Sequence, residues 1–244
     1  MAKEFEGKLV LITGGAGDIA RAAARRFAGE GARLVLADTD AKGLEAARAE
    51  AGAEGRLLDV TDVKAVEAAV EDIRASRGGI DVLVNCAGIY RHRRVVEMSE
   101  PEWDQTLDVN LKGTFAVCRA VGRVMAAQAP GGAIVNLASV SAQRGSALHA
   151  HYCASKAGVV GFGRALALEL APRVRVNAVA PGIIESRMIA DMLPLRGEEW
   201  MRQIPLARYG RPEDVAEAIL FLAGGRASYI NGAVLNVNGG MWMD

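Results

Sequence analysis

The stretch LVLITGGAGDIA, residues 9–20, has the pattern of a strand that runs through a glycine-rich turn into a helix. The apolar run ends at Thr13, and glycines follow at positions 14, 15 and 17. Residues 15–20 form a G-x-G-x-x-A pattern, in which backbone N–H groups at a helix N-terminus can approach a pyrophosphate closely. The stretch therefore predicts a dinucleotide-binding turn, although a tight strand-to-helix turn without a ligand fits the same pattern.

Asp38 favours the dinucleotide hypothesis. It ends the next apolar run, RLVLAD (33–38), about 20 residues beyond the glycines, where a carboxylate accepts hydrogen bonds from an adenine ribose. A carboxylate there also repels a 2′-phosphate, so we expect NAD to be preferred over NADP. The alternative is that Asp38 only caps the following helix, a role for which Asp40 is equally suited.

Short apolar runs alternate with Ala-rich segments of helical period along the whole chain. Nearly continuous apolar strands that alternate with helices are typical of a parallel sheet covered on both faces, so we expect one doubly wound α/β domain over residues 1–244. The longest irregular stretch, 183–214, is a candidate substrate lid centred on residues 183–212. The predicted strands are 8–13, 33–38, 55–60, 80–85, 132–139, 174–180 and 233–238, and the predicted helices are 19–31, 41–51, 62–76, 99–128, 152–171 and 213–223.

The composition excludes several classes of function. The 29 basic and 29 acidic residues balance, so no nucleic-acid or anionic-membrane footprint is expected. The three cysteines, at 86, 118 and 153, match no disulfide or metal framework, which predicts reduced thiols, a cytoplasmic protein and no metal site. The N-terminal MAKEFEGK is not a signal peptide, and no apolar run is long enough for a membrane span.

A candidate catalytic set lies in SVSAQRGSALHAHYCASKAG, residues 139–158. Tyr152 and Lys156 are four residues apart in a predicted helix and share a face. A nearby ammonium favours the phenolate, so we expect Lys156 to lower the pKa of Tyr152 and let it exchange a proton with a substrate oxygen. Ser139, at the end of a strand, is placed to hydrogen-bond the same oxygen. A Y-x-x-x-K pair on its own is more often a solvated helix face.

The chain as a whole resembles the short-chain dehydrogenase/reductase family. The resemblance implies a seven-stranded Rossmann fold, NAD(P)-dependent oxidoreduction of a small alcohol or ketone, and a homotetramer. The matching segments, in the family's order, are TGGAG (13–17), NCAG (85–88), LDVNLKG (107–113), NLASVSA (136–142), YCASK (152–156), NAVAPGIIES (177–186) and INGAVLNVNGG (230–240).

The resemblance also implies residue roles. Ser139, Tyr152 and Lys156 match the catalytic triad, and Asn110 matches the asparagine that holds a water behind the lysine. The residues that match cofactor contacts are Gly14, Gly17, Asp18 and Ile19 in the turn, Asp38, Asp59 and Val60 near the adenine, Asn85, Ala87 and Gly88 on the adenosine side, Tyr152 and Lys156, and Pro181, Gly182, Ile184 and Ser186 on the nicotinamide side.

The glycine turn departs from the family's pattern, T-G-x-x-x-G-x-G, because Asp18 and Ala20 replace its second and third glycines. Aspartate tolerates left-handed backbone angles and caps helices well. We therefore expect Asp18 to keep the turn's shape and to direct its carboxylate at helix N–H groups, which leaves a working turn that disfavours an extra phosphate on the cofactor.

Three functional hypotheses follow. The first is an NAD-dependent dehydrogenase that interconverts a secondary alcohol, of polyol, sugar or hydroxy-acid type, and a ketone. The second is a 3-oxoacyl-(acyl-carrier-protein) reductase, which usually uses NADPH. The third is a catalytically silent nucleotide sensor. Arg144, His149, His151 and the basic segment 90–94 are either substrate contacts or exposed loop residues, with the loop interpretation slightly favoured for the histidines.

Overall fold

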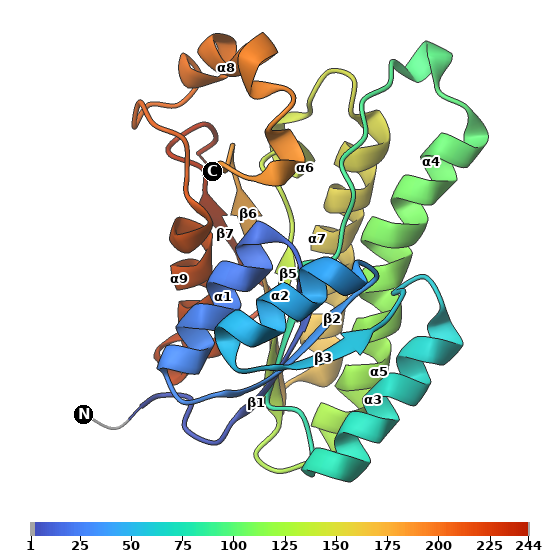
Figure 1. The fold of residues 1–244 in the computed structure, drawn as a ribbon, viewed down its shortest axis with the longest axis vertical. Coiled ribbons are helices and arrows are strands. Elements are labelled where there is room, and N and C mark those ends of the chain that lie inside the picture. The colour runs from blue at the N-terminus through green and yellow to red at the C-terminus, as the bar shows by residue number, and fades with distance from the viewer. Residues whose placement is uncertain (1–2, 244) are drawn as a thin grey trace.

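One parallel sheet of seven strands separates two layers of helices in the computed structural model, which describes residues 3–243 (Figure 1). The strand order is β3-β2-β1-β4-β5-β6-β7, which confirms the doubly wound Rossmann fold predicted from the sequence. The strands are β1 (Leu9–Thr13), β2 (Arg33–Asp38), β3 (Glu54–Leu57), β4 (Val82–Asn85), β5 (Gly132–Leu137), β6 (Val174–Pro181) and β7 (Val234–Val237).

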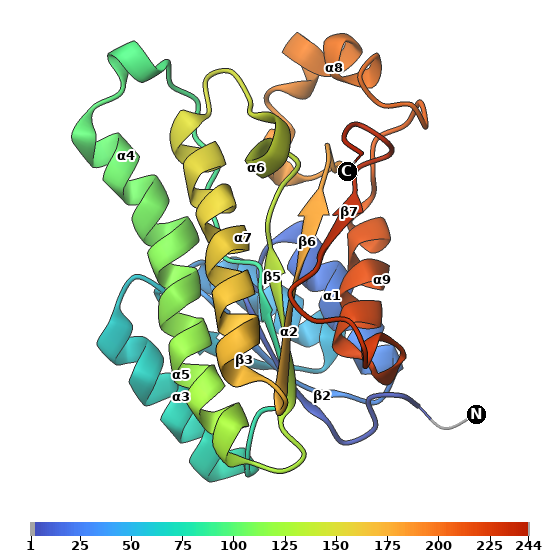
Figure 2. The same cartoon turned by 180° about the vertical axis from the view of Figure 1, so that it is seen from behind.

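Helices cover both faces of the sheet, as the apolar strands require. In Figure 1, α1 and α2 lie in front of the sheet, and in Figure 2 α5 and α7 lie in front of its other face. Phe27 and Ile219 anchor the core on the first side, and Ile73 and Val121 anchor the core on the second. The helices are α1 (Asp18–Gly29), α2 (Ala41–Ala51), α3 (Val63–Arg77), α4 (Glu100–Leu107), α5 (Gly113–Ala127), α6 (Ser141–Arg144), α7 (Ala150–Leu170), α8 (Leu193–Met201) and α9 (Pro212–Ala223).

The helix expected over residues 99–128 is divided in the structure. It begins as predicted, with Glu102 accepting a hydrogen bond from the backbone N–H of Ser99 at 2.9 Å. A π-helical segment, Asp108–Lys112, then separates α4 from α5. The wider turn holds the fully buried Asn110, whose side chain bonds to the backbone outside the helix. A contact between segments far apart along the chain therefore interrupts a helix that periodicity alone predicts to be continuous.

The predicted lid is partly helical. It carries a 3₁₀ turn at Arg187–Ile189 and the helix α8, which the sequence analysis had placed in an irregular stretch. Figure 1 shows this segment at the top of the molecule, on the side where the strands end. Within residues 3–243, no helix combines the length and apolarity needed to cross a membrane.

The crevice between β1 and β4 is where the strand order reverses, the place where ligands bind in doubly wound sheets. Gly14 turns the chain there with a φ of +65°, and a Cβ at this position would lie 2.6 Å from the backbone nitrogen of Ala87. Only glycine allows both the left-handed angle and this close approach of two loops. The turn after β1 is thereby fixed against the turn after β4.

Gly14 and Gly52 offer a matched test of this approach. Gly52 has a φ of +62°, but nothing lies within 4 Å of a Cβ placed there. Gly52→Ala is therefore expected to cost about 1 kcal/mol of unfolding free energy, from backbone strain alone. Gly14→Ala is expected to cost about 2 kcal/mol more, because backbone atoms have to move. Urea unfolding of both variants measures the difference, and equal losses would contradict the close approach.

Candidate active site

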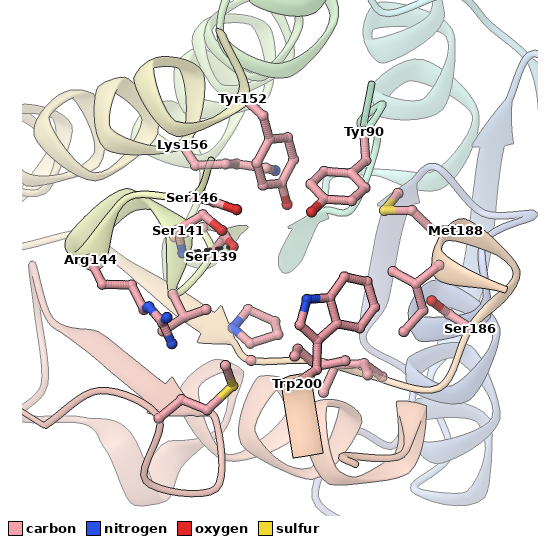
Figure 3. Close-up of a pocket in the computed structure, with 18 of the residues that line it drawn as sticks. Tyr90, Ser139, Ser141, Arg144, Ser146, Tyr152, Lys156, Ser186, Met188 and Trp200 are labelled. Atoms are coloured by element: carbon pink, nitrogen blue, oxygen red, sulfur yellow. Dashed lines mark hydrogen bonds between the residues drawn. The ribbon is translucent and has the colours of Figure 1, made fainter. Parts of the chain in front are cut away.

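A cavity of about 500 Å³ opens at the carboxyl ends of β4, β5 and β6. It brings together the three predicted catalytic side chains, Ser139, Tyr152 and Lys156 (Figure 3). Other predicted site residues line the same cavity: Ile19, Gly88, Pro181, Gly182, Ile184 and Ser186. The catalytic candidates and the nicotinamide-side candidates therefore meet in one space.

Tyr152 and Lys156 lie one turn apart on α7, facing the end of β5. The ammonium of Lys156 is 5.8 Å from the centre of the Tyr152 ring and donates a hydrogen bond of 2.7 Å to the carbonyl oxygen of Leu137. The hydroxyl of Ser139 accepts a hydrogen bond of 3.1 Å from the backbone N–H of Ser141. Its own proton thus remains available for a partner in the cavity.

The pKa of Tyr152 differs from the expectation. Burial raises it to about 12, and a hydrogen bond with Ser139 opposes that rise only in part. The predicted net lowering of the Tyr152 pKa is therefore wrong, because burial outweighs the effect of the ammonium of Lys156. Burial also lowers the pKa of Lys156 to about 8, which weakens its charge as a counterion above that pH. At neutral pH the phenol of Tyr152 holds its proton and is a donor.

Asn110 fixes the loop after β4. Its side-chain oxygen accepts from the backbone N–H of Ile89 at 2.8 Å, and its amide nitrogen donates to the Ile89 carbonyl at 3.0 Å and to Ser155 Oγ at 3.1 Å. A Cβ on Gly88 would lie 3.2 Å from Asn110 Oδ1 and 3.6 Å from Lys156 Nζ. Asn110 thus positions the backbone at Gly88, which carries no side chain, beside Lys156. The role of Asn110 in holding a water stays a prediction.

The side chain of Asn85 lies inside the sheet rather than in the cavity. It donates to Asn136 Oδ1 at 2.8 Å and accepts from the Thr13 hydroxyl at 3.3 Å, which ties β1, β4 and β5 together. Any contact between Asn85 and an adenosine is thereby left to its backbone. Ala87 follows in the same turn, and its backbone N–H donates a hydrogen bond of 3.4 Å to the hydroxyl oxygen of Thr13.

Asp38 braces the glycine turn. One carboxylate oxygen accepts from the backbone N–H of Ala16 at 2.9 Å, and the other accepts from the N–H of Asp40 at 2.9 Å. The helix α2 is capped by Asp40, whose side chain accepts from the Gly43 N–H at 3.0 Å. The alternative role considered for Asp38, that of helix cap, therefore belongs to Asp40.

Asp18 does not act as expected. It is the first residue of α1, it has no left-handed backbone angle, and its carboxylate does not cap the helix. Instead it accepts from the backbone N–H of Arg187 at 2.7 Å and from the Arg187 guanidinium at 3.0 Å. The guanidinium also donates to the Ala16 carbonyl. The acid is thus paired with a cation from the lid, which local sequence does not reveal because the two are far apart along the chain.

The glycine turn fits the diphosphate of a dinucleotide. Gly17 precedes α1 and offers no side chain to cap it, so the first N–H groups of the helix are not taken up by a cap at this position. Cβ atoms on Gly14 and Gly15 would each come within 2.8 Å of neighbouring atoms, so backbone rather than side chains lines the turn. Arg187 adds a cation beside it.

Asp59 and Val60 lie beyond the end of β3. The carboxylate of Asp59 accepts from the backbone N–H and the hydroxyl of Thr61 at 2.8 and 2.7 Å, and Val60 is buried in the core beside α5. Their predicted contacts with an adenine stay predictions. At the other end of the site, Gly182 packs so closely that a Cβ would lie 2.8 Å from Asn238 Cα.

The histidines are not exposed loop residues. His149 and His151 are both fully buried, so the favoured loop interpretation is wrong. His149 stacks on the ring of Tyr90 at 4.3 Å, and Tyr90 meets the ring of Tyr152 edge-on at 4.8 Å. The sequence analysis grouped Tyr90 only with a basic segment. Its place next to Tyr152 follows from the packing of two distant loops, and no local pattern indicates it.

Comparison with known proteins agrees with this geometry. The family model described as enoyl-(acyl carrier protein) reductase matches residues 14–242. The chain is 43% identical to the 3-oxoacyl-(acyl-carrier-protein) reductase FabG of Thermotoga maritima, over 97% of this chain and 98% of that protein. The chain is a short-chain dehydrogenase/reductase. This result confirms the resemblance seen in the sequence. The family consists of oxidoreductases that use a nicotinamide cofactor.

Two further relatives of this short-chain dehydrogenase have other names. The D-threitol dehydrogenase of Mycolicibacterium smegmatis is 42% identical over 97% of this chain and 93% of that protein. A solved structure from Brucella melitensis, titled short-chain dehydrogenase/reductase and glucose/ribitol dehydrogenase, has a TM-score of 0.94 and 40% identity, covering all of both chains. The family is therefore shared by relatives with different substrates in their names.

The buried ammonium gives a testable pH dependence. Because the folded-state pKa of Lys156 is lowered from 10.5 to about 8, burial of its charge destabilises the fold below pH 8. This cost fades as the pH rises towards the unfolded value. Lys156→Met is therefore expected to raise the unfolding free energy at neutral pH, by up to about 3 kcal/mol. The gain is expected to vanish near pH 10.5.

Denaturant unfolding of the variant and the parent at both pH values measures this difference. Lys42→Met, at an exposed position of α2, is the matched control and is expected to change stability little at either pH. A Lys156→Met variant that is less stable than the parent at neutral pH would show that the bond to Leu137 outweighs the burial of charge.

Proposed function

We propose that this short-chain dehydrogenase reduces the ketone of a 3-oxoacyl thioester to a secondary alcohol. The observation that carries the proposal is the meeting of the Ser139 and Tyr152 hydroxyls with Lys156 in one cavity, where a carbonyl oxygen can be held and protonated. The similarity to FabG reductases over nearly the whole chain supports the substrate class. A bound nicotinamide dinucleotide supplies the hydride.

The chain's own residues handle the proton. The hydroxyls of Ser139 and Tyr152 face the cavity and hold the substrate's carbonyl oxygen (Figure 3). As hydride adds to the carbonyl carbon, the proton of Tyr152 passes to the oxygen and leaves a phenolate. The ammonium of Lys156, 5.8 Å from the ring centre, then stabilises that phenolate and favours the transfer.

A second candidate is an NAD-dependent dehydrogenase of a polyol-type alcohol. Asp38 favours it, because each of its oxygens accepts one hydrogen bond from the backbone and retains a lone pair for a ribose hydroxyl. The same carboxylate opposes the 2′-phosphate of NADPH, the usual cofactor of 3-oxoacyl reductases. The similarity to D-threitol dehydrogenase supports this candidate as well. A cytoplasmic location and a homotetramer stay predictions.

Tyr152→Phe tests the proton donor. The variant is expected to reduce acetoacetyl-N-acetylcysteamine with a kcat lower by about 10³-fold or more, because it lacks the proposed general acid. Its affinity for the nicotinamide cofactor, measured by the quenching of protein fluorescence, is expected to be unchanged. Normal turnover in this variant would refute the role of Tyr152. Cofactor binding by the parent without turnover of any ketone or alcohol would favour the silent sensor.

Asp38→Ser separates the two candidates through the cofactor. In the parent, we expect kcat/KM for NADH to exceed that for NADPH, because Asp38 repels the 2′-phosphate. The substitution is expected to lower the ratio of kcat/KM for NADH to kcat/KM for NADPH by about 10-fold, the effect of one close charge. The measurement is run in parallel for acetoacetyl-N-acetylcysteamine reduction and D-threitol oxidation, and turnover of threitol alone would select the dehydrogenase. A parent that prefers NADPH would show that Asp38 does not set the choice.

A further inference from the structure

Tyr90 lies at the substrate side of the cavity, outside the set of residues that handle the proton. Its ring meets that of Tyr152 edge-on, with the centres 4.8 Å apart, and both residues line the cavity. Figure 3 shows their hydroxyls pointing into the same space, with Ser139 and Ser146 on one side. A substrate held at Tyr152 is therefore within reach of a second phenol.

The orientation of Tyr90 is fixed from behind by His149. The two rings stack at 4.3 Å with an angle of 11°, and His149 is fully buried. His149 is itself held at both ring nitrogens, by Ser146 Oγ at 2.8 Å from Nδ1 and by His92 Nδ1 at 2.7 Å from Nε2. The phenol of Tyr90 thus rests on a ring that cannot turn without breaking two hydrogen bonds.

His149 does not hold the proton of the Tyr90 hydroxyl in either tautomer, and the hydroxyl also hydrogen-bonds Ser146, which lines the same cavity. If Nδ1 of His149 is an acceptor, Ser146 at 2.8 Å fills it better than Tyr90 at 3.4 Å. If Nδ1 carries the proton, it cannot accept from Tyr90 at all. Burial raises the pKa of Tyr90 to about 12, so its hydroxyl keeps its proton at neutral pH.

We propose that Tyr90 determines substrate specificity by donating a hydrogen bond to a second oxygen of the substrate, next to the reacting carbonyl. The ligand chemistry is a ketone with a neighbouring oxygen acceptor, either the thioester carbonyl of a 3-oxoacyl group or the hydroxyl of an α-hydroxyketone. The inference rests on the proposed oxidoreductase function and adds the feature that the substrate must carry.

The second oxygen matters because the hydroxyl of Tyr90 is partly removed from water. A substrate that fills the cavity without an acceptor at this place leaves a desolvated donor unpaired, and one that carries the acceptor satisfies it. Sites built in this way reject analogues that lack the polar group more strongly than apolar pockets reject analogues of a different size. Discrimination is therefore expected in kcat/KM between ketones of similar bulk.

Tyr90→Phe tests the proposal, since it removes one oxygen and keeps the ring contacts with His92, His149 and Tyr152. We expect kcat/KM to fall about 10-fold, the effect of one hydrogen bond, for acetoacetyl-N-acetylcysteamine, for hydroxyacetone, or for both. The value for cyclohexanone, which has no second oxygen, is expected to change less than twofold. Cofactor affinity and melting temperature are measured on the same preparation. Tyr229→Phe, at a fully exposed tyrosine, is the matched control and should change none of these values.

Each outcome decides a separate point. A selective loss with the thioester alone assigns the second oxygen to a 3-oxoacyl group, and a selective loss with hydroxyacetone alone assigns it to an α-hydroxyketone. Equal loss for all three ketones, or no loss for any, would overturn the specificity role of Tyr90. A parent enzyme that turns over none of the ketones would instead count against the proposed function itself.

Discussion

The site depends on a buried ammonium held by one backbone carbonyl, the bond from Lys156 to Leu137 at the end of β5. This bond joins the middle of α7 to the strand end that also carries Ser139, so the serine hydroxyl and the phenol of Tyr152 face the same space. The cost of burying the charge is visible in the lowered pKa of Lys156. The fold tolerates it because the two apolar cores on either side of the sheet supply stability elsewhere.

The altered glycine turn is held by charges from other parts of the chain. Asp18 would place an unpaired carboxylate at the N-terminus of α1, where a diphosphate is expected, and such charges repel. Arg187 removes that conflict by pairing with Asp18, and it ties the start of the lid to the same turn through the carbonyl of Ala16. The pair is partly solvated, so its strength falls with salt, but its position also sets where the lid lies.

The sequence predicted the sheet, and the meeting of Ser139, Tyr152 and Lys156 in one place, because both depend on local or strongly patterned signals. The helix α2 has the predicted bounds, and α7 brings Tyr152 and Lys156 to one face as the four-residue spacing requires. The failures share another cause. The π-helical break at Asn110, the burial of His149 and the pairing of Asp18 each depend on contacts between segments far apart along the chain. No window of periodicity or propensity contains such contacts.

The same long-range burial sets the protonation state in which the site rests. Proton transfer passes through the Tyr152 phenolate in both directions, and burial, which raises the pKa of this phenol to about 12, disfavours that ion. The charge of Lys156 offsets part of the cost of forming the phenolate. Because the pKa of Lys156 is about 8, this charge is lost as the pH rises above that value. The ring of Tyr90 packs against that of Tyr152, and His149 stacks on Tyr90. The residue proposed to set substrate specificity and the phenol that handles the proton therefore belong to one cluster of rings, and a change in either is transmitted to the other through direct contact.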